Sequence, residues 1–215
     1  MRVRKKKRTA DVLNNSQKII SANFNIDWKK YFGNEGKICL EIGCGKGKFI
    51  NQMSLEFKNK NFVAMEICPD IIISAIEKAE KNNLTNIFFI VDNDENLEKY
   101  FLRGQVNEIY INFCDPWPKK RHAKRRLTHK NFLDIYKKIL APTGKIFFKT
   151  DNKDLFDFSL NEFAVNGFEL KNICYDLHKK NPGIKNIETE YEEKFLILNM
   201  PIFYCEAFLL RDEKR

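Results

Sequence analysis

The sequence predicts an α/β fold, with a mostly parallel sheet and helices on both of its faces. Short apolar runs typical of buried strands alternate with helix-like segments, at the spacing of repeated β-α-β units. The chain has 215 residues, of which 43% are hydrophobic, so it can bury a core without disulfide bonds. The first strand-like run also leads directly into a glycine-rich turn, where open α/β sheets bind their ligands. The hydrophobic fraction of 43% also excludes a mainly disordered chain.

The elements follow from the apolar pattern, taken in chain order. Residues 1–36 are polar with scattered apolar positions and end in a Gly-Asn-Glu-Gly turn, so we expect a basic N-terminal extension with one or two short helices. We expect one domain over residues 37–215. Its first five strands are expected at 37–42, 61–67, 86–91, 108–113 and 144–149. The helices between them are expected near 47–57, 70–82, 95–102 and 129–140.

The last third of the chain departs from simple strand–helix alternation. We expect, in order, a helix near 153–165, a strand at 168–177, a long loop, a short helix near 190–198 and a final strand at 203–210. We expect the last two strands to pair with each other in antiparallel fashion at one edge of the sheet. The result is a seven-stranded mixed sheet, mostly parallel, with an antiparallel last strand.

Positive charge is concentrated in two short segments. The formal charge is 38 − 29 = +9, and residues 1–8 and 119–126 each hold six Lys or Arg side chains and no acid. The remaining chain is therefore net 9 − 12 = −3. Two concentrated patches indicate a polyanionic partner, with nucleic acid as the first candidate. The alternatives are a solvated tail with a charged helix face and, for the first segment, a membrane-surface contact, which no amphipathic or lipidation signal supports.

The sequence carries no signal for a membrane span, for secretion or for a metal site. No stretch approaches 18 uncharged apolar residues, and the segment after the basic start is too polar for the apolar core of a signal peptide. The six cysteines form no CxxC pair, and His122, His129 and His178 lack metal-ligand spacing. We therefore expect a soluble, cytoplasmic protein with free thiols and no bound metal.

A glycine-rich turn follows the first strand and forms the start of a candidate ligand site. Residues 41–47 read EIGCGKG, and glycine at every second position allows a sharp turn and the close approach of a ligand. The turn is not the dinucleotide fingerprint, because Lys48 stands where that motif requires glycine. The Gly-Lys-Ser or Gly-Lys-Thr of a P-loop is also absent.

Acids at the ends of the next two strands extend this site. Glu66 can accept hydrogen bonds from both hydroxyls of a ribose, and Asp92, Asn93 and Asp94 can reach an adenine edge. Glu41 would face the amino-acid tail of the ligand. Glycines flanked by acids suit a cationic nucleoside such as S-adenosylmethionine. The alternative for any one acid is a helix cap or a surface ion pair, but acids at three successive strand ends favour a site.

The fourth strand ends in a second candidate site. Residues 112–122 read NFCDPWPKKRH, in which two prolines bracket Trp117 and stiffen the loop that carries Asp115. Lys119 opens the second basic segment directly afterwards. A carboxylate, an aromatic face and phosphate-binding cations within twelve residues indicate a nucleobase site. The alternative is an Asp-Pro turn followed by a charged helix start.

Five motifs together resemble a known family. They are the ExGxGxG turn, the acid that ends the second strand, the block NFxDPWPKKRHxKRRLT, the tetrapeptide KTDN at 149–152 and the sequence TEYEEKF at 189–195. In this combination the chain is similar to the bacterial tRNA (guanine-N7-)-methyltransferase family. The resemblance implies a Rossmann-like class I methyltransferase fold and S-adenosyl-L-methionine as donor. It also implies tRNA as partner, with methylation at N7 of a guanine in the variable loop to form 7-methylguanosine.

The resemblance also implies roles for individual residues. Donor binding falls on Glu41, Gly43, Gly45, Glu66, Asn93 and Asp115. Substrate binding falls on Lys119, Asp151, Thr189, Glu190, Tyr191 and Glu192. The family usually has Asp where this chain has Asn93, so it stays open whether Asp92, Asn93 or Asp94 contacts the adenine.

The chemistry of N7 methylation is compatible with this residue set. Guanine N7 has an in-plane lone pair and no proton, so it can attack a sulfonium methyl without a general base. The task of the enzyme is then alignment and electrostatic stabilisation. We expect Asp115 to be the catalytic carboxylate, because it can accept from the N1–H and N2–H donors of guanine and balance the charge that the base gains.

Two other functions stay open at this point. One is methylation of an exocyclic amine of a nucleic acid, since an Asp-Pro-aromatic motif at this strand end also suits an amino group. The other is a non-catalytic RNA-binding protein on the same scaffold, although a pure binder has no need of the glycine turn and the strand-end acids. The sequence leaves the oligomeric state open between monomer and homodimer.

Overall fold

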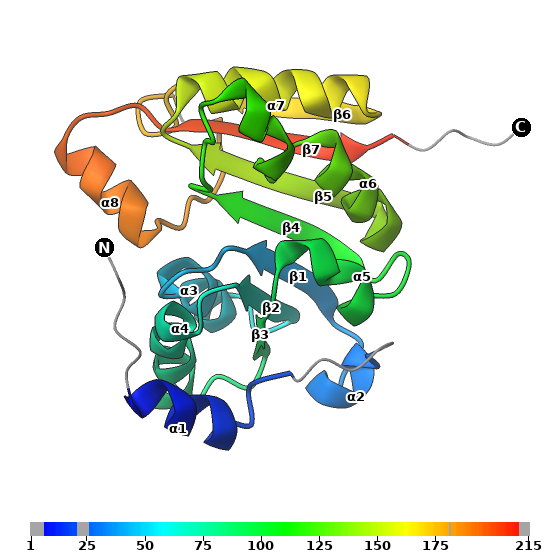
Figure 1. Ribbon diagram of the computed structural model, residues 1–215, viewed down its shortest axis with the longest axis vertical. Coiled ribbons are helices and arrows are strands. Elements are labelled where there is room, and N and C mark those ends of the chain that lie inside the picture. Colours follow the sequence, from blue (N-terminus) through cyan, green and yellow to red (C-terminus); the bar gives the residue numbers. More distant parts are fainter. Residues whose placement is uncertain (1–6, 21–25, 181, 211–215) are drawn as a thin grey trace, which may run out of the picture. The chain divides into compact units, whose positions relative to one another are not determined.

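The computed structural model describes residues 7–20, 26–180 and 182–210 (Figure 1). The chain divides into two compact units, Met1–Phe101 and Leu102–Arg215. The strand order is β3-β2-β1 in the first unit and β4-β5-β7-β6 in the second.

The first unit contains three parallel strands with their helices. Its elements are α1 (Lys7–Asn15), α2 (Trp28–Phe32), β1 (Lys37–Ile42), α3 (Lys48–Glu56), β2 (Lys60–Glu66), α4 (Pro69–Lys81), β3 (Ile87–Val91), the short 3-10 helix η1 (Asp94–Asn96) and α5 (Leu97–Tyr100). Both β1 and β3 pair with β2 in parallel. The middle of β2, Asn61 to Met65, is completely buried, as expected for a strand whose apolar run has no polar face.

The N-terminal segment packs on these strands and helices. Helix α1 lies against α4, where Arg8 pairs with Glu77 and the Thr9 hydroxyl donates to Asp70 at 2.6 Å. Further along, Trp28 of α2 is 1% exposed, and its indole N–H donates to the Tyr100 carbonyl at 3.0 Å. The expectation of one or two short helices before residue 37 is confirmed, with α1 and α2 present, while a domain boundary at 36/37 stays a prediction.

The second unit contains four strands of mixed direction. Its elements are β4 (Val106–Asn112), the 3-10 helix η2 (Lys120–Arg125), α6 (Lys130–Ile139), β5 (Leu140–Thr150), α7 (Lys153–Val165), β6 (Phe168–Cys174), α8 (Glu190–Ile197) and β7 (Phe203–Leu209). Strands β4 and β5 are parallel, whereas β7 is antiparallel to both β5 and β6. The prediction of seven strands with an antiparallel last strand is therefore confirmed.

Two boundaries in this unit differ by three or more residues from those expected, and β4 begins two residues earlier than expected, at Val106. Strand β5 begins at Leu140, directly after α6, because Leu140 already pairs with Val106 of β4 across an irregularity in the ladder. Strand β6 ends at Cys174 rather than near 177. Its register shifts after Lys171, where Asn172 takes the left-handed backbone conformation (φ 52°) of a bulge. A short 3-10 helix, η2, lies within the basic segment, where the sequence left a charged helix start after the Asp-Pro turn as the alternative.

The two faces of the sheet in the second unit differ in chemistry. On one face, Phe148 of β5 packs against Phe156 and Phe163 of α7, which gives a buried aromatic core. On the other face, Glu206 of β7 accepts hydrogen bonds from Lys145, Asn172 and Tyr204 and is 3% exposed. This buried carboxylate is therefore compensated by three donors.

Across the part of the chain that the structure describes, every helix is too short or too polar to cross a membrane.

Candidate functional site

The glycine turn after β1 is built from backbone that only glycine adopts without strain. Gly43, Gly45 and Gly47 have φ values of 73°, 56° and 73°. A Cβ atom placed on Gly43 or Gly45 would meet no heavy atom within 4 Å, so the backbone there faces open space. A Cβ on Gly47 would lie 2.3 Å from the Cβ of Ala75 in α4. The first two glycines therefore leave room for a ligand, and the third allows close packing of the helices.

Glu66 at the end of β2 is held against this turn. Its Oε2 accepts from the Gly45 N–H at 3.1 Å, and its Oε1 accepts from the Cys68 N–H at 3.0 Å. Each carboxylate oxygen has more than one acceptor site, so Glu66 can still accept from ribose hydroxyls. The structure thus brings together Glu66 and Gly45, two residues of the predicted donor site. Glu41, near the end of β1, is 2% exposed.

The three residues after β3 have different surroundings. Asp92 accepts from the Tyr100 hydroxyl (2.7 Å), the Asn96 amide (2.9 Å) and the Asn93 N–H (2.7 Å). Burial disfavours ionisation of Asp92, but these hydrogen bonds outweigh it, and its pKa lies below the usual value. The Asn93 side chain is exposed and caps η1 by accepting from the Glu95 N–H at 3.1 Å.

Asp94 differs from Asp92 because its pKa is raised rather than lowered. Burial raises the pKa of Asp94 to about 7, and the negative charge of Glu66 contributes further. This coupling indicates that Asp94 and Glu66 lie in the same electrostatic environment. A raised carboxyl pKa beside a candidate ligand site is typical of a functional residue. The sequence offered no signal that would have separated Asp94 from Asp92.

The loop after β4 contains two bulky residues in a left-handed conformation. Phe113 has φ 52° and Trp117 has φ 42°, a state that costs about 1–3 kcal/mol per residue and persists only where surrounding contacts impose it. Asp115 lies between them and is exposed. Because strain of this kind concentrates at functional sites, the loop is the strongest structural indication of a site in the second unit.

Several contacts impose this loop conformation. The Phe113 N–H donates to the Lys149 carbonyl at 2.9 Å, and its ring stacks with Phe195 of α8 at 5.9 Å between centroids. Arg126 donates from Nε to the Pro116 carbonyl (3.1 Å) and from Nη2 to the Trp117 carbonyl (3.0 Å). The sequence placed Arg126 among the phosphate-binding cations, and nothing in it signalled this bridging geometry.

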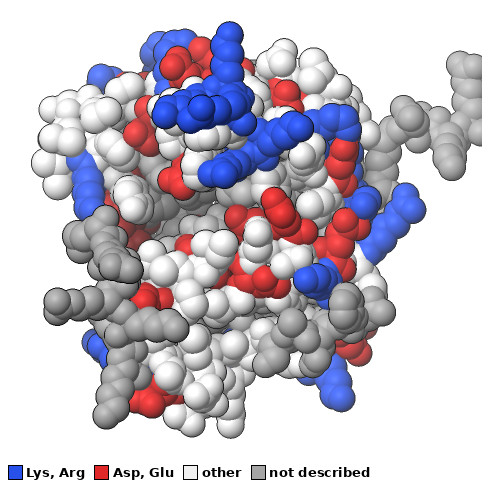
Figure 2. All heavy atoms as spheres, in the orientation of Figure 1, with Lys and Arg blue, Asp and Glu red and all other residues white. Residues whose placement is uncertain are grey.

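Other members of the second basic segment face solvent. The exposed side chains of this group are Lys119, Lys120, Arg121, Lys124 and Arg125. Figure 2 shows Lys and Arg side chains gathered over the part of the second unit that Figure 1 draws in green. Of the first basic segment, Arg2, Arg4, Lys5 and Lys6 lie outside the described residues, and Arg8 pairs with Glu77.

The segment predicted to bind substrate at the start of α8 has a buried framework. Thr189 caps the helix by accepting from the Glu192 N–H at 3.0 Å, and the Glu192 carboxylate accepts in return from the Thr189 N–H. Glu192 is completely buried and pairs with Lys149 of β5 at 2.7 Å. Tyr191 is 59% exposed. Direct substrate contacts of these residues stay a prediction, but Thr189 and Glu192 already have structural partners.

Asp151 and Glu190, the remaining predicted substrate residues, are both half-buried. Asp151 directly follows β5, and Glu190 lies in the first turn of α8.

All six cysteines are free thiols, four of them buried. Within the described ranges, no group of three His, Cys, Asp or Glu side chains is arranged to hold a metal ion.

Comparisons with known proteins agree with these features. A family model described as "Putative methyltransferase" matches residues 35–205. The tRNA (guanine-N(7)-)-methyltransferase of Clostridioides difficile (strain 630) is 47% identical over 180 residues, with 84% of each chain covered. The protein of the same name from Lactococcus lactis subsp. cremoris (strain SK11) is 41% identical over 214 residues, with 98% of this chain and 99% of the relative covered.

A solved structure supports the fold independently. The crystal structure of the 16S rRNA methyltransferase KamB is similar with a TM-score of 0.66 at 14% identity, and the match covers 89% of this chain and 96% of that one. At this identity the likeness establishes the fold alone, which is that of class I methyltransferases. The family model, the level of identity and the coverage together establish that the chain belongs to the tRNA (guanine-N7-)-methyltransferase family.

Proposed function

We propose that this protein is a tRNA (guanine-N7-)-methyltransferase, which transfers a methyl group from S-adenosyl-L-methionine to N7 of a guanine in the variable loop of tRNA. The observation that carries the proposal is the strained loop after β4, which presents an exposed Asp115 directly before a group of exposed cations. Membership of the family supports the reaction and the substrate. The variable loop and a cytoplasmic location belong to the proposal through the family resemblance.

The donor would be held by the first unit. Glu66 would accept from the ribose hydroxyls, and its bonds to the Gly45 and Cys68 N–H groups fix the direction of its carboxylate. The open space over Gly43 and Gly45 leaves the backbone accessible. We also assign the buried Glu41 to the amino-acid end and the 92–94 segment to the adenine. When bound, S-adenosylmethionine supplies a methyl group activated by its sulfonium.

The base would be oriented by the second unit. Asp115 would accept hydrogen bonds from N1–H and N2–H of guanine, two donors that match the two oxygens of a carboxylate. Its negative charge would stabilise the positive charge that the base gains at N7. No proton has to leave N7, so the mechanism needs no general base. Asp115 therefore acts through position and charge.

The tRNA backbone would be held mainly by charge. Lys119, Lys120, Arg121 and Lys124 are exposed and can bind phosphates. Such contacts give affinity and orientation but carry no sequence information. The exposed ring of Tyr191 can additionally stack on a base. Choice of the guanine therefore falls to Asp115 and its surroundings.

The test is to incubate the purified protein with labelled S-adenosylmethionine and bulk tRNA, digest the RNA and identify the labelled nucleoside. The expected product is 7-methylguanosine, which is identified by its fixed positive charge and its lability to alkali. An N-methylated exocyclic amine as product would replace the proposal by the related activity. RNA binding without any labelled product would indicate a non-catalytic RNA-binding protein.

A further inference from the structure

Arg126 differs from the other cations of the second basic segment. It closes that segment, yet its guanidinium points back to the loop that carries Asp115. Two of its nitrogens donate to consecutive carbonyls of the loop, those of Pro116 and Trp117, at 3.1 and 3.0 Å. Two donors in a fixed plane define the position of both peptide groups, which a single contact could not do.

Arg126 is itself anchored to helix α7. Its guanidinium carbon lies 4.3 Å from the centroid of the Phe158 ring. Two residues further along, the hydroxyls of Thr128 and Ser159 share a hydrogen bond of 2.7 Å, and both side chains are completely buried. The Lys130 N–H then donates to Glu162 at 2.8 Å. Contacts from Arg126, Thr128 and Lys130 therefore all hold this segment against helix α7.

The loop that Arg126 holds cannot keep its conformation by itself. Trp117 has φ 42°, which a bulky side chain rarely adopts. The carbonyl groups on and before this strained residue are the two that Arg126 binds. Asp115 precedes them directly in the chain, so any relaxation of the peptides at 116 and 117 would move its carboxylate.

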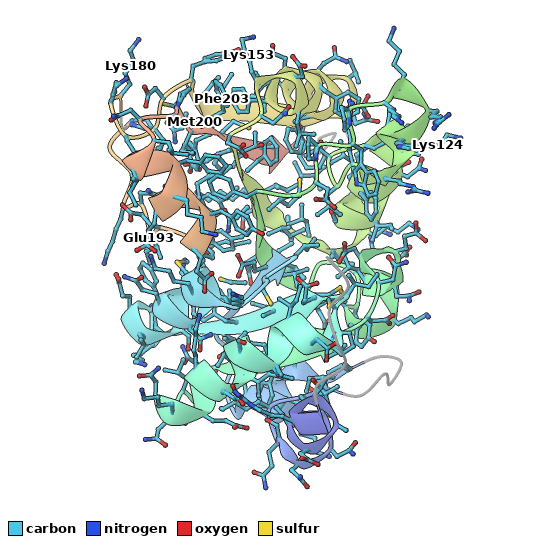
Figure 3. The ribbon with its side chains drawn as sticks, turned by 60° about the vertical axis from the view of Figure 1, so that its left-hand side comes forward. Lys124, Lys153, Lys180, Glu193, Met200 and Phe203 are labelled. Carbon is cyan, nitrogen blue, oxygen red and sulfur yellow. The ribbon has the colours of Figure 1, made fainter. Side chains whose placement is uncertain are left out.

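We infer that Arg126 is a positioning residue for methyl transfer: it links helix α7 to the Pro116 and Trp117 carbonyls and thereby fixes Asp115. It does not serve as a phosphate contact, although it belongs to the basic segment. Lys124, two residues earlier, is the matched contrast. Lys124 is exposed, has no partner in the described part of the chain, and points outward from the second unit (Figure 3).

The kinetic experiment compares Arg126→Lys with Lys124→Ala. Arg126→Lys keeps the positive charge but cannot donate to two carbonyls in one plane. We expect kcat to fall about 10–100-fold, as small misplacements of a catalytic group do, with little change in KM for tRNA. Lys124→Ala should instead raise KM and reduce the salt dependence of tRNA binding, with kcat near that of the wild type. This comparison rests on the proposed function.

A second measurement does not depend on activity. The chain has two tryptophans, and Trp28 is 1% exposed, so quenching by acrylamide reports mainly on Trp117. Arg126→Lys should increase that quenching, and Lys124→Ala should leave it unchanged. If Arg126→Lys does not fold, Phe158→Leu tests the same link, because it removes the ring beneath the guanidinium; it should shift quenching and kcat in the same directions.

The outcomes separate the possibilities. Reduced kcat with increased Trp117 quenching supports the inference. A wild-type kcat and wild-type quenching in Arg126→Lys would overturn it. Raised KM and a smaller salt slope with unchanged kcat would show that Arg126 is a phosphate contact. If the wild-type protein proves inactive on tRNA, the proposed function fails, and the quenching result alone still decides whether Arg126 fixes the loop.

Discussion

The turn at 43–47 and the loop at 113–117 reach the same left-handed backbone conformation with different kinds of residue. Both follow a parallel strand, and both need backbone with positive φ. The turn uses glycines at each such position, which adopt it without strain and leave open space above Gly43 and Gly45. The loop uses Phe113 and Trp117, whose strain must be offset by contacts from Arg126, Phe195 and the Lys149 carbonyl.

The difference shows what each region has to present. A turn that receives a ligand against its backbone needs empty space, and side chains there would fill it. A loop that presents a carboxylate to a base needs a fixed direction, and large side chains supply the contacts that fix it. Substitutions in both regions can test this contrast, and their expected effects range from a large loss of turnover to a small difference in stability.

Asp115→Asn should have the largest effect, on turnover. The change keeps the size of the side chain, removes its charge and turns one acceptor into a donor that faces the donors of guanine. Loss of one preorganised electrostatic group costs on the order of 10²–10³ in rate. We expect kcat to fall by that factor, with tRNA affinity nearly unchanged and no rescue by higher pH.

The control is Asp157→Asn, which removes an exposed carboxylate of α7 whose partner is Lys153. It should retain wild-type turnover. Near wild-type turnover in Asp115→Asn would remove Asp115 from the mechanism and direct attention to Asp151.

Gly47→Ala should have the next largest effect, on stability. The added Cβ would lie 2.3 Å from the Ala75 Cβ and 2.9 Å from Asn51 Nδ2, at a backbone φ of 73°. Overpacking and backbone strain together should lower the free energy of unfolding by about 2–4 kcal/mol, measured by urea denaturation.

The matched variants are Gly43→Ala and Gly45→Ala, which add the same atom where no heavy atom lies within 4 Å. They should lose only about 1 kcal/mol of stability, but donor affinity measured by calorimetry should fall. Equal losses of stability at all three glycines would contradict the distinction between packing and ligand space.

Asp94→Asn should change the pH dependence of stability. The pKa of Asp94 is raised from 3.8 to about 7, so between these pH values the folded protein holds a proton that the unfolded chain has released. Stability therefore falls as pH rises through this window. Asp94→Asn should stabilise the protein at pH 8 by on the order of 1–2 kcal/mol, allowing for residual solvent around the carboxyl, and change little near pH 4.

Asp92→Asn provides the opposite sign on the same segment. The pKa of Asp92 is lowered by the hydrogen bonds that it accepts in spite of its burial. Its substitution should therefore destabilise the protein at pH 8 and do so less at low pH. A parallel shift of both variants at all pH values, in urea denaturation series, would show that neither carboxyl titrates differently on folding.

Phe113 offers the finest test of backbone strain. Phe113→Ala and Phe113→Gly both remove the ring and its stacking with Phe195, but only glycine adopts φ 52° freely. The glycine variant should be more stable than the alanine variant by about 0.5–1 kcal/mol, measured by thermal unfolding. An alanine variant of equal or greater stability would show that the loop relaxes once the ring is gone.

Local sequence pattern was sufficient to define the order and type of the main elements. Strands such as Lys37–Ile42 and Ile87–Val91 are short apolar runs, and helices such as Pro69–Lys81 show helical periodicity. The glycine turn and the acid at 66 were also found from sequence, because their roles depend on position relative to a strand end. The structure confirmed that these two are in contact.

Which charged residues are used internally could be seen only in the folded chain. Arg126 and Lys124 look alike in a basic run, and Glu192 looks like any acid at the start of a helix. Arg126 donates hydrogen bonds to the carbonyls of Pro116 and Trp117, ten and nine residues earlier in the chain. The buried carboxylate of Glu192 pairs with Lys149, 43 residues earlier. Contacts of this kind depend on which segments folding brings together, and no local pattern of charge or hydrophobicity encodes them.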